Sequence, residues 1–391
     1  MGKLAIKAAR VLTPLQDLRD AVVLIEDDRI AAVGRQANVT IPEDAEVMDF
    51  GDRIMVPGFV DVHNHGANGR WAREGPEVVK EIARWLAQTG TTSWLATVGD
   101  VESIKAVVQA SREGTGGTAI PGIHCEGPFL APKKLPGQPY REKPLADIAL
   151  YHQMLEAGDG LIRIMDCAPD LPGAMELIRE IVRTGVSASC AHSKTDYATF
   201  MRGVEAGIRH VTHTYNVMSG MHHRRPNIVG GVLTCDAVVG ELIADGFHVH
   251  PVAMDVLIRC KGFDKVCTVT DSTPLAGLPD GEYHFRGRTV IKKNGISRMA
   301  GFDETQDGSM AGSEWPVNHD LWTLVDKVGV RLQDAVRMAT LTPASTAGLA
   351  KDIGSLEPGK YADVAVIDER VNVYVTIVRG EIVYRAESCL S

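Results

Sequence analysis

The sequence predicts an α/β fold, namely a (β/α)8 TIM-type barrel with a small β-sandwich domain built from both chain termini. Eight short apolar runs alternate with amphipathic helical patterns through the middle of the chain, as is typical of parallel strands joined by crossover helices. Strand-like segments occupy both ends of the chain. Histidines and carboxylates lie at or near the ends of several apolar runs, and a barrel brings its strand ends to one rim.

The two terminal segments are expected to pair into one small β domain. At the start of the chain the strand candidates are KLAIKAARVL, AVVLIEDDRIAAVGR and AEVMDFGDRIMV, and at its end they are YADVAVID, VYVTIVR and GEIVYRA. Each alternates between apolar and polar residues or runs apolar, with turn residues between them. The predicted limits are 1–55 and 351–391 for the two parts of the β-sandwich and 56–350 for the barrel.

The eight predicted barrel strands are, in order, GFVDVHNH, TSWLATV, AIPGIHCEG, LIRIMDCAP, VSASCAH, HVTHTY, ELIADGFHV and KVCTVTD. Helical patterns separate many of them, including PEVVKEIARWLAQTG, VESIKAVVQASREG, AMELIREIVRTG and YATFMRGVEAG. The alternative is an open, doubly wound sheet. The glycine signature GxGxxG of a nucleotide site is absent after the first strand, and a count of eight favours a closed barrel.

A long segment rich in glycine and polar residues, 272–313, follows the eighth strand. Within it, HFRGRTVIKKNGISRMAG predicts a hairpin that turns at Asn294 and Gly295. Two helices, near WPVNHDLWTLVDKVG and LQDAVRMATLTPAST, then complete the barrel. Long loops at the C-terminal face of a barrel commonly shape the active site, so this segment is expected to border it.

Composition excludes several classes of protein. The formal net charge of −9 argues against nucleic acid or an anionic membrane as partner, and no apolar run is long enough for a membrane span. The first residues, MGKLAIKAARVL, lack the features of a secretory signal. The seven cysteines are odd in number and contain no CxxC pair, so a disulfide framework is not expected. We therefore expect a cytoplasmic protein.

The strand ends carry a set of residues with the chemistry of metal ligands. His63 and His65 lie two apart and so share one face of the first barrel strand. Such an HxH pair is a weak signal alone, but later strand ends add Glu126, His192, His213 and Asp271. Glu126 could bridge two ions through its two oxygens. We expect one or two divalent ions per subunit, zinc first, with iron, manganese or cobalt as alternatives that the same ligands accept.

Asp271 is also the expected catalytic residue. An ionised aspartate beside a metal can take the proton of the attacking water and deliver it to a departing amine. The alternative is that Asp271 caps a helix that begins at STPLAG. The apolar strand VCTV directly before it makes that alternative less attractive.

Longer motifs resemble the N-acetylglucosamine-6-phosphate deacetylase family of the amidohydrolase superfamily. The matching segments are GIHCEGPFL, HTYNVMSGMHHRRP, ADGFHVH, VTDSTPLAGLPDG and MAGS, and the resemblance extends from VPGFVDVHNHG to GSLEPGKYADVAVID. It implies that Glu126, His192 and His213 bind one metal, that His63 and His65 hold a second, and that Asp271 is the acid/base.

The resemblance also implies contacts to a phosphorylated amino sugar. Arg224 would bind the phosphate, reaching the neighbouring site of a homodimer, and His248 would contact the sugar or its phosphate. The remaining implied contacts are Gln138, Asn216, the backbone of Val217, and the loop Met310, Ala311 and Gly312. Departures from the family pattern occur at Arg225, Asn227 and the segment Glu314-Trp315-Pro316, and they bear on the substrate more than on the reaction.

Structural alternatives apply to several of these residues. The run from His222 to Arg225 could be a solvated basic turn, and His124 a packed strand histidine. No role is predicted for His152, His210, His250, His284 and His319.

The leading functional hypothesis is hydrolysis of the N-acetyl group of an amino-sugar 6-phosphate. A second is an amidohydrolase of the same fold that acts on another N-acyl or cyclic amide. Many cyclic amidohydrolases carry a carboxylated lysine on the fourth strand, whereas LIRIMDCAP has none. A remote third is a non-catalytic scaffold, which should lack several ligands, yet all six are present.

Overall fold

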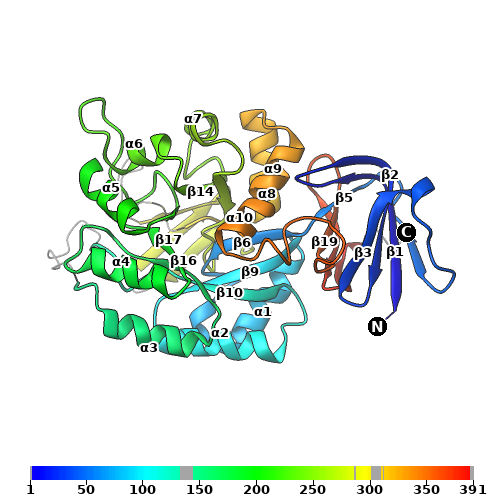
Figure 1. Ribbon diagram of the computed structural model, residues 1–391, viewed down its shortest axis with the longest axis horizontal. Helices are drawn as coiled ribbons and strands as arrows, with labels where there is room; N and C mark the ends of the chain where they lie inside the picture. The colour runs from blue at the N-terminus through cyan, green and yellow to red at the C-terminus, as the bar shows by residue number, and fades with distance from the viewer. Residues whose placement is uncertain (1, 133–143, 286–287, 301–309, 311, 388–391) are drawn as a thin grey trace.

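The computed structural model describes residues 2–132, 144–285, 288–300, 310 and 312–387. A barrel with its surrounding helices forms the larger part, and a β domain stands at one end of it (Figure 1). The first and last described strands both lie in the β domain. The predicted division into a barrel and a terminal β domain is therefore confirmed, while the exact limits between them stay a prediction.

The predicted eight-stranded parallel barrel is confirmed. Its hydrogen-bonded sheet has the order β15-β14-β13-β12-β11-β10-β9-β6, and Asn64 pairs with Ser272 in a parallel bridge between the two ends of that sheet. Every residue of the barrel strand TTSWLATV is buried, because helices cover the outer face of a parallel barrel. The strands are β6 (Phe59–Asn64), β9 (Thr91–Val98), β10 (Ala119–Cys125), β11 (Ile162–Asp166), β12 (Ser187–Cys190), β13 (His210–Val211), β14 (Val239–Ile243) and β15 (Val266–Val269).

Amphipathic helices cover the barrel. Helix α4, for example, turns Leu177, Ile178 and Ile181 inward, and α2 begins where Asp100 accepts a hydrogen bond from the N–H of Ser103. No helix of the described residues is long and apolar enough to cross a membrane. The α-helices are α1 (Pro76–Ala87), α2 (Val101–Glu113), α3 (Ile148–Gly158), α4 (Ala174–Arg183), α5 (Tyr197–Ala206), α6 (Asn227–Thr234), α7 (Pro251–Lys261), α8 (Val317–Thr323), α9 (Leu332–Met338) and α10 (Leu341–Thr346), with short helices η1 (Gln36–Asn38), η2 (Ala72–Glu74) and η3 (Leu324–Val328).

The strands of the β domain form one mixed sheet that joins both ends of the chain. Strand β5 (Ile54–Pro57) pairs parallel with β1 (Lys3–Leu12) and antiparallel with β19 (Val364–Ile367), so it links the N-terminal and C-terminal strands. One face of this sheet buries an apolar core that includes Ile6, Val23 and Val366. The other strands are β2 (Asp17–Glu26), β3 (Arg29–Arg35), β4 (Glu46–Asp49), β20 (Val373–Val378) and β21 (Glu381–Arg385).

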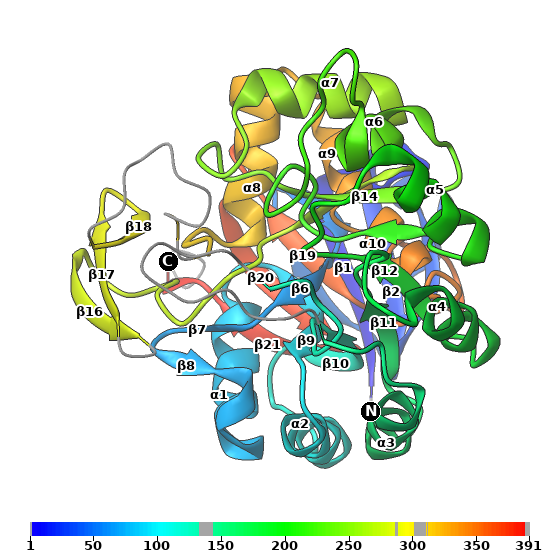
Figure 2. The same cartoon turned by 90° about the vertical axis from the view of Figure 1, so that its left-hand side faces the viewer.

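The predicted hairpin after the eighth barrel strand is present and turns at the expected residues. Asn294 and Gly295 both have positive φ, 53° and 71°, as a tight type I′ turn requires. The turn joins β17 (Arg288–Lys293) to β18 (Ile296–Met299), and β16 (Gly281–Phe285) completes a three-stranded sheet. Figure 2 shows this sheet at the margin of the barrel, on the same side as the short strands β7 (Gly66–Ala67) and β8 (Arg70–Trp71).

A buried carboxyl beside β19 gives the β domain a pH-dependent stability. Burial raises the pKa of Asp363 to about 6, although its Oδ1 accepts the backbone N–H of Arg379 at 2.8 Å. The unfolded chain would release this proton near its usual pKa of about 3.9. The folded state therefore holds more protons between these values, and this group's contribution to stability falls as the pH rises from about 4 through 6.

We expect Asp363→Asn to raise the melting temperature of metal-free protein at pH 8 and to change it little at pH 4.5. The amide keeps the oxygen that accepts the Arg379 N–H and removes the buried charge, which costs roughly 1–3 kcal/mol above pH 6 for a shift of about two units. Thermal melting of parent and variant at both pH values measures the difference. An equal effect at both values would show that the charge of Asp363 does not govern this stability.

Candidate metal centre

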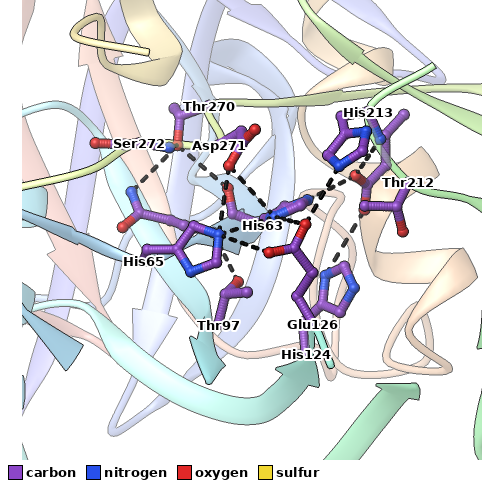
Figure 3. A network of polar contacts seen from close by, with 12 residues as sticks. His63, His65, Thr97, His124, Glu126, Thr212, His213, Thr270, Asp271 and Ser272 are labelled. Carbon is purple, nitrogen blue, oxygen red and sulfur yellow. Dashed lines mark hydrogen bonds and ion pairs between the residues drawn. The ribbon is translucent and has the colours of Figure 1, made fainter. Parts of the chain in front are cut away.

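The six predicted metal ligands converge at the C-terminal mouth of the barrel. Figure 3 shows five of them, namely His63, His65, Glu126, His213 and Asp271. Each lies within the last two residues of its strand or just beyond its end, on β6, β10, β12, β13 and β15. They form two groups of donor atoms, one of His63, His65 and Asp271 and the other of Glu126, His192 and His213, with all atoms of a group within 4.8 Å of one another.

The donor atoms of the first group form a nearly equilateral triangle. The Nε2 atoms of His63 and His65 are 3.4 Å apart, and each lies 3.4 Å from Oδ1 of Asp271. A tetrahedral ion with bonds of about 2.0–2.1 Å separates its ligand atoms by about 3.3 Å. The geometry of this group therefore fits a divalent ion without movement of the side chains.

The second group is more compact and is joined to the first through Glu126. Oε1 of Glu126 lies 2.6 Å from Nε2 of His192 and 3.2 Å from Nε2 of His213, and the two ring nitrogens are 3.0 Å apart. The other carboxylate oxygen, Oε2, lies 3.2 Å from Nε2 of His65. Glu126 thus presents one oxygen to each group, as a bridge between two ions requires.

Three of the ligands lie in strained backbone. His192, His213 and Asp271 have φ of 45°, 34° and 48°, in the left-handed region that residues other than glycine seldom adopt. Each follows its strand by two residues, so the unusual φ turns the side chain from the strand into the mouth. Such strain persists only where the surroundings enforce it, and it is concentrated at functional sites.

Neighbouring segments hold Asp271 in place. Its N–H donates to the carbonyl of His63 at 2.8 Å, and its own carbonyl accepts the N–H of Ser313 at 3.2 Å. Gly312 lies so close that a Cβ there would come within 3.2 Å of that carbonyl and 2.2 Å of the Thr273 side chain, so this position requires glycine. Residues 272–277 form no helix, and the alternative of Asp271 as a helix cap is therefore excluded.

The electrostatics of the mouth keep the carboxylates ionised. Burial disfavours charge on Asp271, but the nearby His63 and the hydrogen bond from His65 lower the pKa of its carboxyl to about 2. Burial likewise opposes charge on His65, yet Asp271 and Glu126 raise its pKa to about 10. The pKa of Glu126 lies well below its usual range, because its histidine neighbours outweigh its desolvation. A positive ion can take the place of the protons that these histidines hold.

A second layer of polar groups lies in the barrel interior beneath the ligands, and the sequence did not reveal it. Glu241 on β14 is fully buried and contacts His63 and His210. His124 is also buried, with its Nδ1 2.9 Å from the carbonyl of Val62 and its Nε2 3.3 Å from Asp166. The prediction that His124 is a packed strand histidine fits this position. The sequence offered one signal for Glu241, namely a carboxylate in the apolar run ELIADG. A charge that is buried in this way requires partners.

The predicted substrate contacts are distributed around the mouth. Asn216 and Val217 follow His213 in the same loop, and the N–H of Asn216 donates to the His213 carbonyl at 2.9 Å. His248 follows β14, where its Nδ1 lies 2.7 Å from Oδ2 of Asp245. Burial opposes charge on His248, but Asp245 raises its pKa. Gln138 and Ala311 lie outside the described residues.

Arg224, Met310 and Gly312 complete the predicted contacts. Arg224 is exposed in the loop between β13 and α6, where His222 and Arg225 form an antiparallel bridge on either side of it. Met310 forms an antiparallel bridge with Arg298, which places it beside β18 of the hairpin. Gly312 lies against the backbone of Asp271, as described above.

Two residues at which the sequence departs from the family pattern serve to pack the hairpin. Glu314 is buried and pairs with Lys292 of β17 at 2.8 Å. Trp315 stacks on His319 with 3.9 Å between ring centroids. The turn at Gly295 abuts the Trp315 ring, because a Cβ there would lie 2.3 Å from it. This packing fixes the hairpin against the segment that contacts Asp271.

The chain is similar to known proteins over most of its length. The model of the amidohydrolase family matches residues 54–383. N-acetylglucosamine-6-phosphate deacetylase of Bacillus subtilis (strain 168) is 32% identical over 391 residues, covering 97% of this chain and 97% of that protein. N-acetylgalactosamine-6-phosphate deacetylase of Escherichia coli O157:H7 is 31% identical over 387 residues, covering 96% of this chain and 98% of that protein.

Solved structures give the same similarity in three dimensions. N-acetylglucosamine-6-phosphate deacetylase from Pasteurella multocida matches with a TM-score of 0.88 and 26% identity, over 98% of this chain and all (100%) of that one. A mutant of the enzyme from Mycobacterium smegmatis, in complex with N-acetyl-D-glucosamine-6-phosphate, matches with a TM-score of 0.87 and 27% identity, over 98% and 100% of the two chains.

Proposed function

The chain belongs to the amidohydrolase family, and on that premise we propose that it hydrolyses the N-acetyl group of an amino-sugar 6-phosphate to acetate and the free amine. It is a metal-dependent hydrolase of amides. Similarity over nearly the whole chain to N-acetylglucosamine-6-phosphate deacetylases supports that sugar phosphate as the first candidate substrate. The E. coli relative makes its galactosamine epimer the next one to test.

The observation that carries this proposal is the pair of donor triangles joined by Glu126, with Asp271 at a corner of one. The chemistry that a bound divalent ion supplies is a lowered pKa for the attacking water and polarisation of the amide carbonyl. Histidine and carboxylate donors at these spacings suit zinc, and iron, manganese and cobalt accept the same ligands. We propose zinc as the first candidate.

In the proposed reaction Asp271 moves one proton. Its depressed pKa leaves it ionised in the resting enzyme, so it can accept a proton from the attacking water. A bond then forms between the water oxygen and the carbonyl carbon, and the carbon–nitrogen bond breaks. Asp271 returns its proton to the leaving nitrogen, which departs as the amine, while the acetyl group leaves as acetate.

Residues around the mouth would bind the rest of the substrate. With Nδ1 directed to Asp245, His248 has its Nε2 available to donate to a sugar hydroxyl or the phosphate. We propose that Asn216, Val217, Met310, Gly312 and the undescribed Gln138 and Ala311 contact the sugar. The net charge of −9 means that attraction of a phosphate must come from a local basic patch, such as the one around Arg224. We further propose a cytoplasmic homodimer in which Arg224 reaches the neighbouring site.

The test of the proposal is an amine-release assay over a panel of substrates. The panel contains N-acetylglucosamine-6-phosphate, its galactosamine epimer, both unphosphorylated sugars and several N-acyl amino acids. We expect the highest kcat/KM for a phosphorylated sugar. Preference for an N-acyl amino acid or a cyclic amide would leave a metal-dependent amidohydrolase with a different substrate.

Arg224→Ala should weaken catalysis selectively. Loss of a charge-assisted bond to phosphate costs roughly 1.5–3 kcal/mol, which is about 10- to 150-fold in kcat/KM. Because Arg224 is exposed and outside the barrel core, its removal should leave folding unchanged. The measurement is kcat/KM for the phosphorylated sugar and its unphosphorylated analogue. A matched variant is Arg225→Ala, the neighbouring arginine, for which we expect a smaller effect. Equal losses on both substrates would mean that Arg224 does not bind phosphate.

A further inference from the structure

Glu241 occupies a central position beneath the metal centre, although it contacts no reacting atom. Its side chain is fully buried on β14, one layer below the ligands. Oε2 lies 2.8 Å from Nδ1 of His63 and 2.9 Å from the backbone nitrogen of His213. Oε1 lies 2.8 Å from Nε2 of His210. One carboxylate therefore contacts a residue from each of the two groups of predicted ligands.

The contact with His63 determines which ring nitrogen is free to bind a metal. An ionised carboxylate only accepts hydrogen bonds, so Nδ1 of His63 must carry the proton that it donates to Oε2. The lone pair is then on Nε2, which is the atom 3.4 Å from both His65 Nε2 and Asp271 Oδ1. Ligating histidines are commonly fixed in this way by a carboxylate on the other ring nitrogen.

The contact with His213 acts on the backbone. His213 has a φ of 34°, a strained conformation that its surroundings must enforce. Its N–H donates to the same oxygen that accepts from His63. Glu241 therefore holds two parts of the site: the ring of His63, and the turn that directs the ring of His213 toward Glu126.

We propose that Glu241 is a positioning residue that fixes both halves of the metal centre at once, selecting Nε2 of His63 as the ligand atom and holding the turn at His213. His210 supports it: Nε2 of His210 donates to Oε1, and Nδ1 lies 2.8 Å from the hydroxyl of Thr346. The proposal rests on the metal centre described under Proposed function and is independent of the identity of the substrate.

The experiment compares the metal affinity of graded variants of the full chain. Zinc is titrated into metal-free protein in competition with a chromophoric chelator. Loss of a residue that orients a ligand typically lowers metal affinity about 10- to 100-fold. The loss of zinc affinity in Glu241→Gln should lie at the low end of this range, because its amide oxygen can still accept hydrogen bonds from His63 and His213. The loss in Glu241→Leu should lie at the high end of the range or beyond it, because leucine can accept neither hydrogen bond.

Thr346→Val is the matched control. It removes the outermost contact of the same chain of hydrogen bonds and leaves both bonds of Glu241 to the ligand residues, so its affinity should stay within about three-fold of the parent. A residue needed only for folding would lower the melting temperature of metal-free Glu241→Gln without changing its affinity. Parental affinity in Glu241→Gln and Glu241→Leu would overturn the proposal, whereas a parent that binds no zinc would overturn the metal centre itself.

A measurement on the parent keeps the proposal testable if Glu241→Leu does not fold. In protein labelled with 15N at histidine, two-bond 1H–15N spectra distinguish the two neutral ring forms. We expect His63, assigned by comparison with His63→Asn, to carry its proton on Nδ1 in the zinc-loaded protein. A proton on Nε2 of His63 would overturn the proposal.

Discussion

Asp271→Asn should keep the fold and retain bound metal while losing most turnover. The amide has the shape of the carboxylate and an oxygen that can still face the donor atoms of His63 and His65, but it cannot accept a proton from water. General acid–base groups contribute roughly 100- to 10,000-fold, and Asp271 is proposed to act in both the attack and the departure of the amine. We therefore expect kcat to fall by at least that range.

Metal analysis and kinetics on one preparation separate the two possible roles of Asp271. If the variant keeps its metal and loses turnover, the loss lies in proton transfer. Asp255→Asn is a suitable control, because Asp255 is partly exposed on α7, pairs with Arg259 and is not among the predicted ligands or substrate contacts, so its removal should leave kcat unchanged. Activity of Asp271→Asn within a few-fold of the parent would remove Asp271 from the mechanism.

The barrel could be predicted because its signals are local. Each strand is a short apolar run, and each helix between them repeats its apolar residues at helical spacing, so both patterns are visible without knowledge of the partners. The ligands were found for a related reason: they lie at strand ends, and a closed parallel barrel brings strand ends together whatever their distance in sequence. The Asn294-Gly295 turn was equally local.

The ends of the strands were less accurately predicted. The run HVTHTY was interpreted as a strand, but β13 contains only His210 and Val211, and His213 follows it in a left-handed conformation. Likewise β6 ends at Asn64, so His65 reaches His63 from beyond the strand. Alternation of faces along a strand does not extend to such residues, because their backbone is set by contacts from other strands.

Glu241 and His210 were not predicted, for a different physical reason. The partners of Glu241 lie 178 and 31 residues away in sequence, and closure of the barrel alone brings them together. No spacing motif marks such a group. For the same reason His210 was given no role, although its ring is buried against Glu241 and Thr346.

His213→Ala and His192→Ala should each abolish or strongly weaken metal binding by the group of ligands that contains Glu126. Both rings place Nε2 within 3.2 Å of Glu126 Oε1, and removal of either leaves two donors where three stood. The loss in affinity should exceed the roughly 10- to 100-fold that removal of a supporting contact causes. Activity should fall with it, because the polarisation of the carbonyl depends on the ion. His63→Ala should act separately, on the ion held with His65 and Asp271.

Metal content per chain after dialysis against metal-free buffer distinguishes these effects. We expect His213→Ala and His192→Ala to lose one and the same ion, and His63→Ala to lose the other if the parent holds two. His152→Ala is the matched control, since His152 is a half-exposed histidine that pairs with Glu180 on the outer helices. It should keep the parental metal content.

Because the metal competes with protons for the same nitrogens, metal occupancy of the parent should also fall as the pH is lowered. Unchanged stoichiometry in all three ligand variants would show that these histidines do not bind the metal.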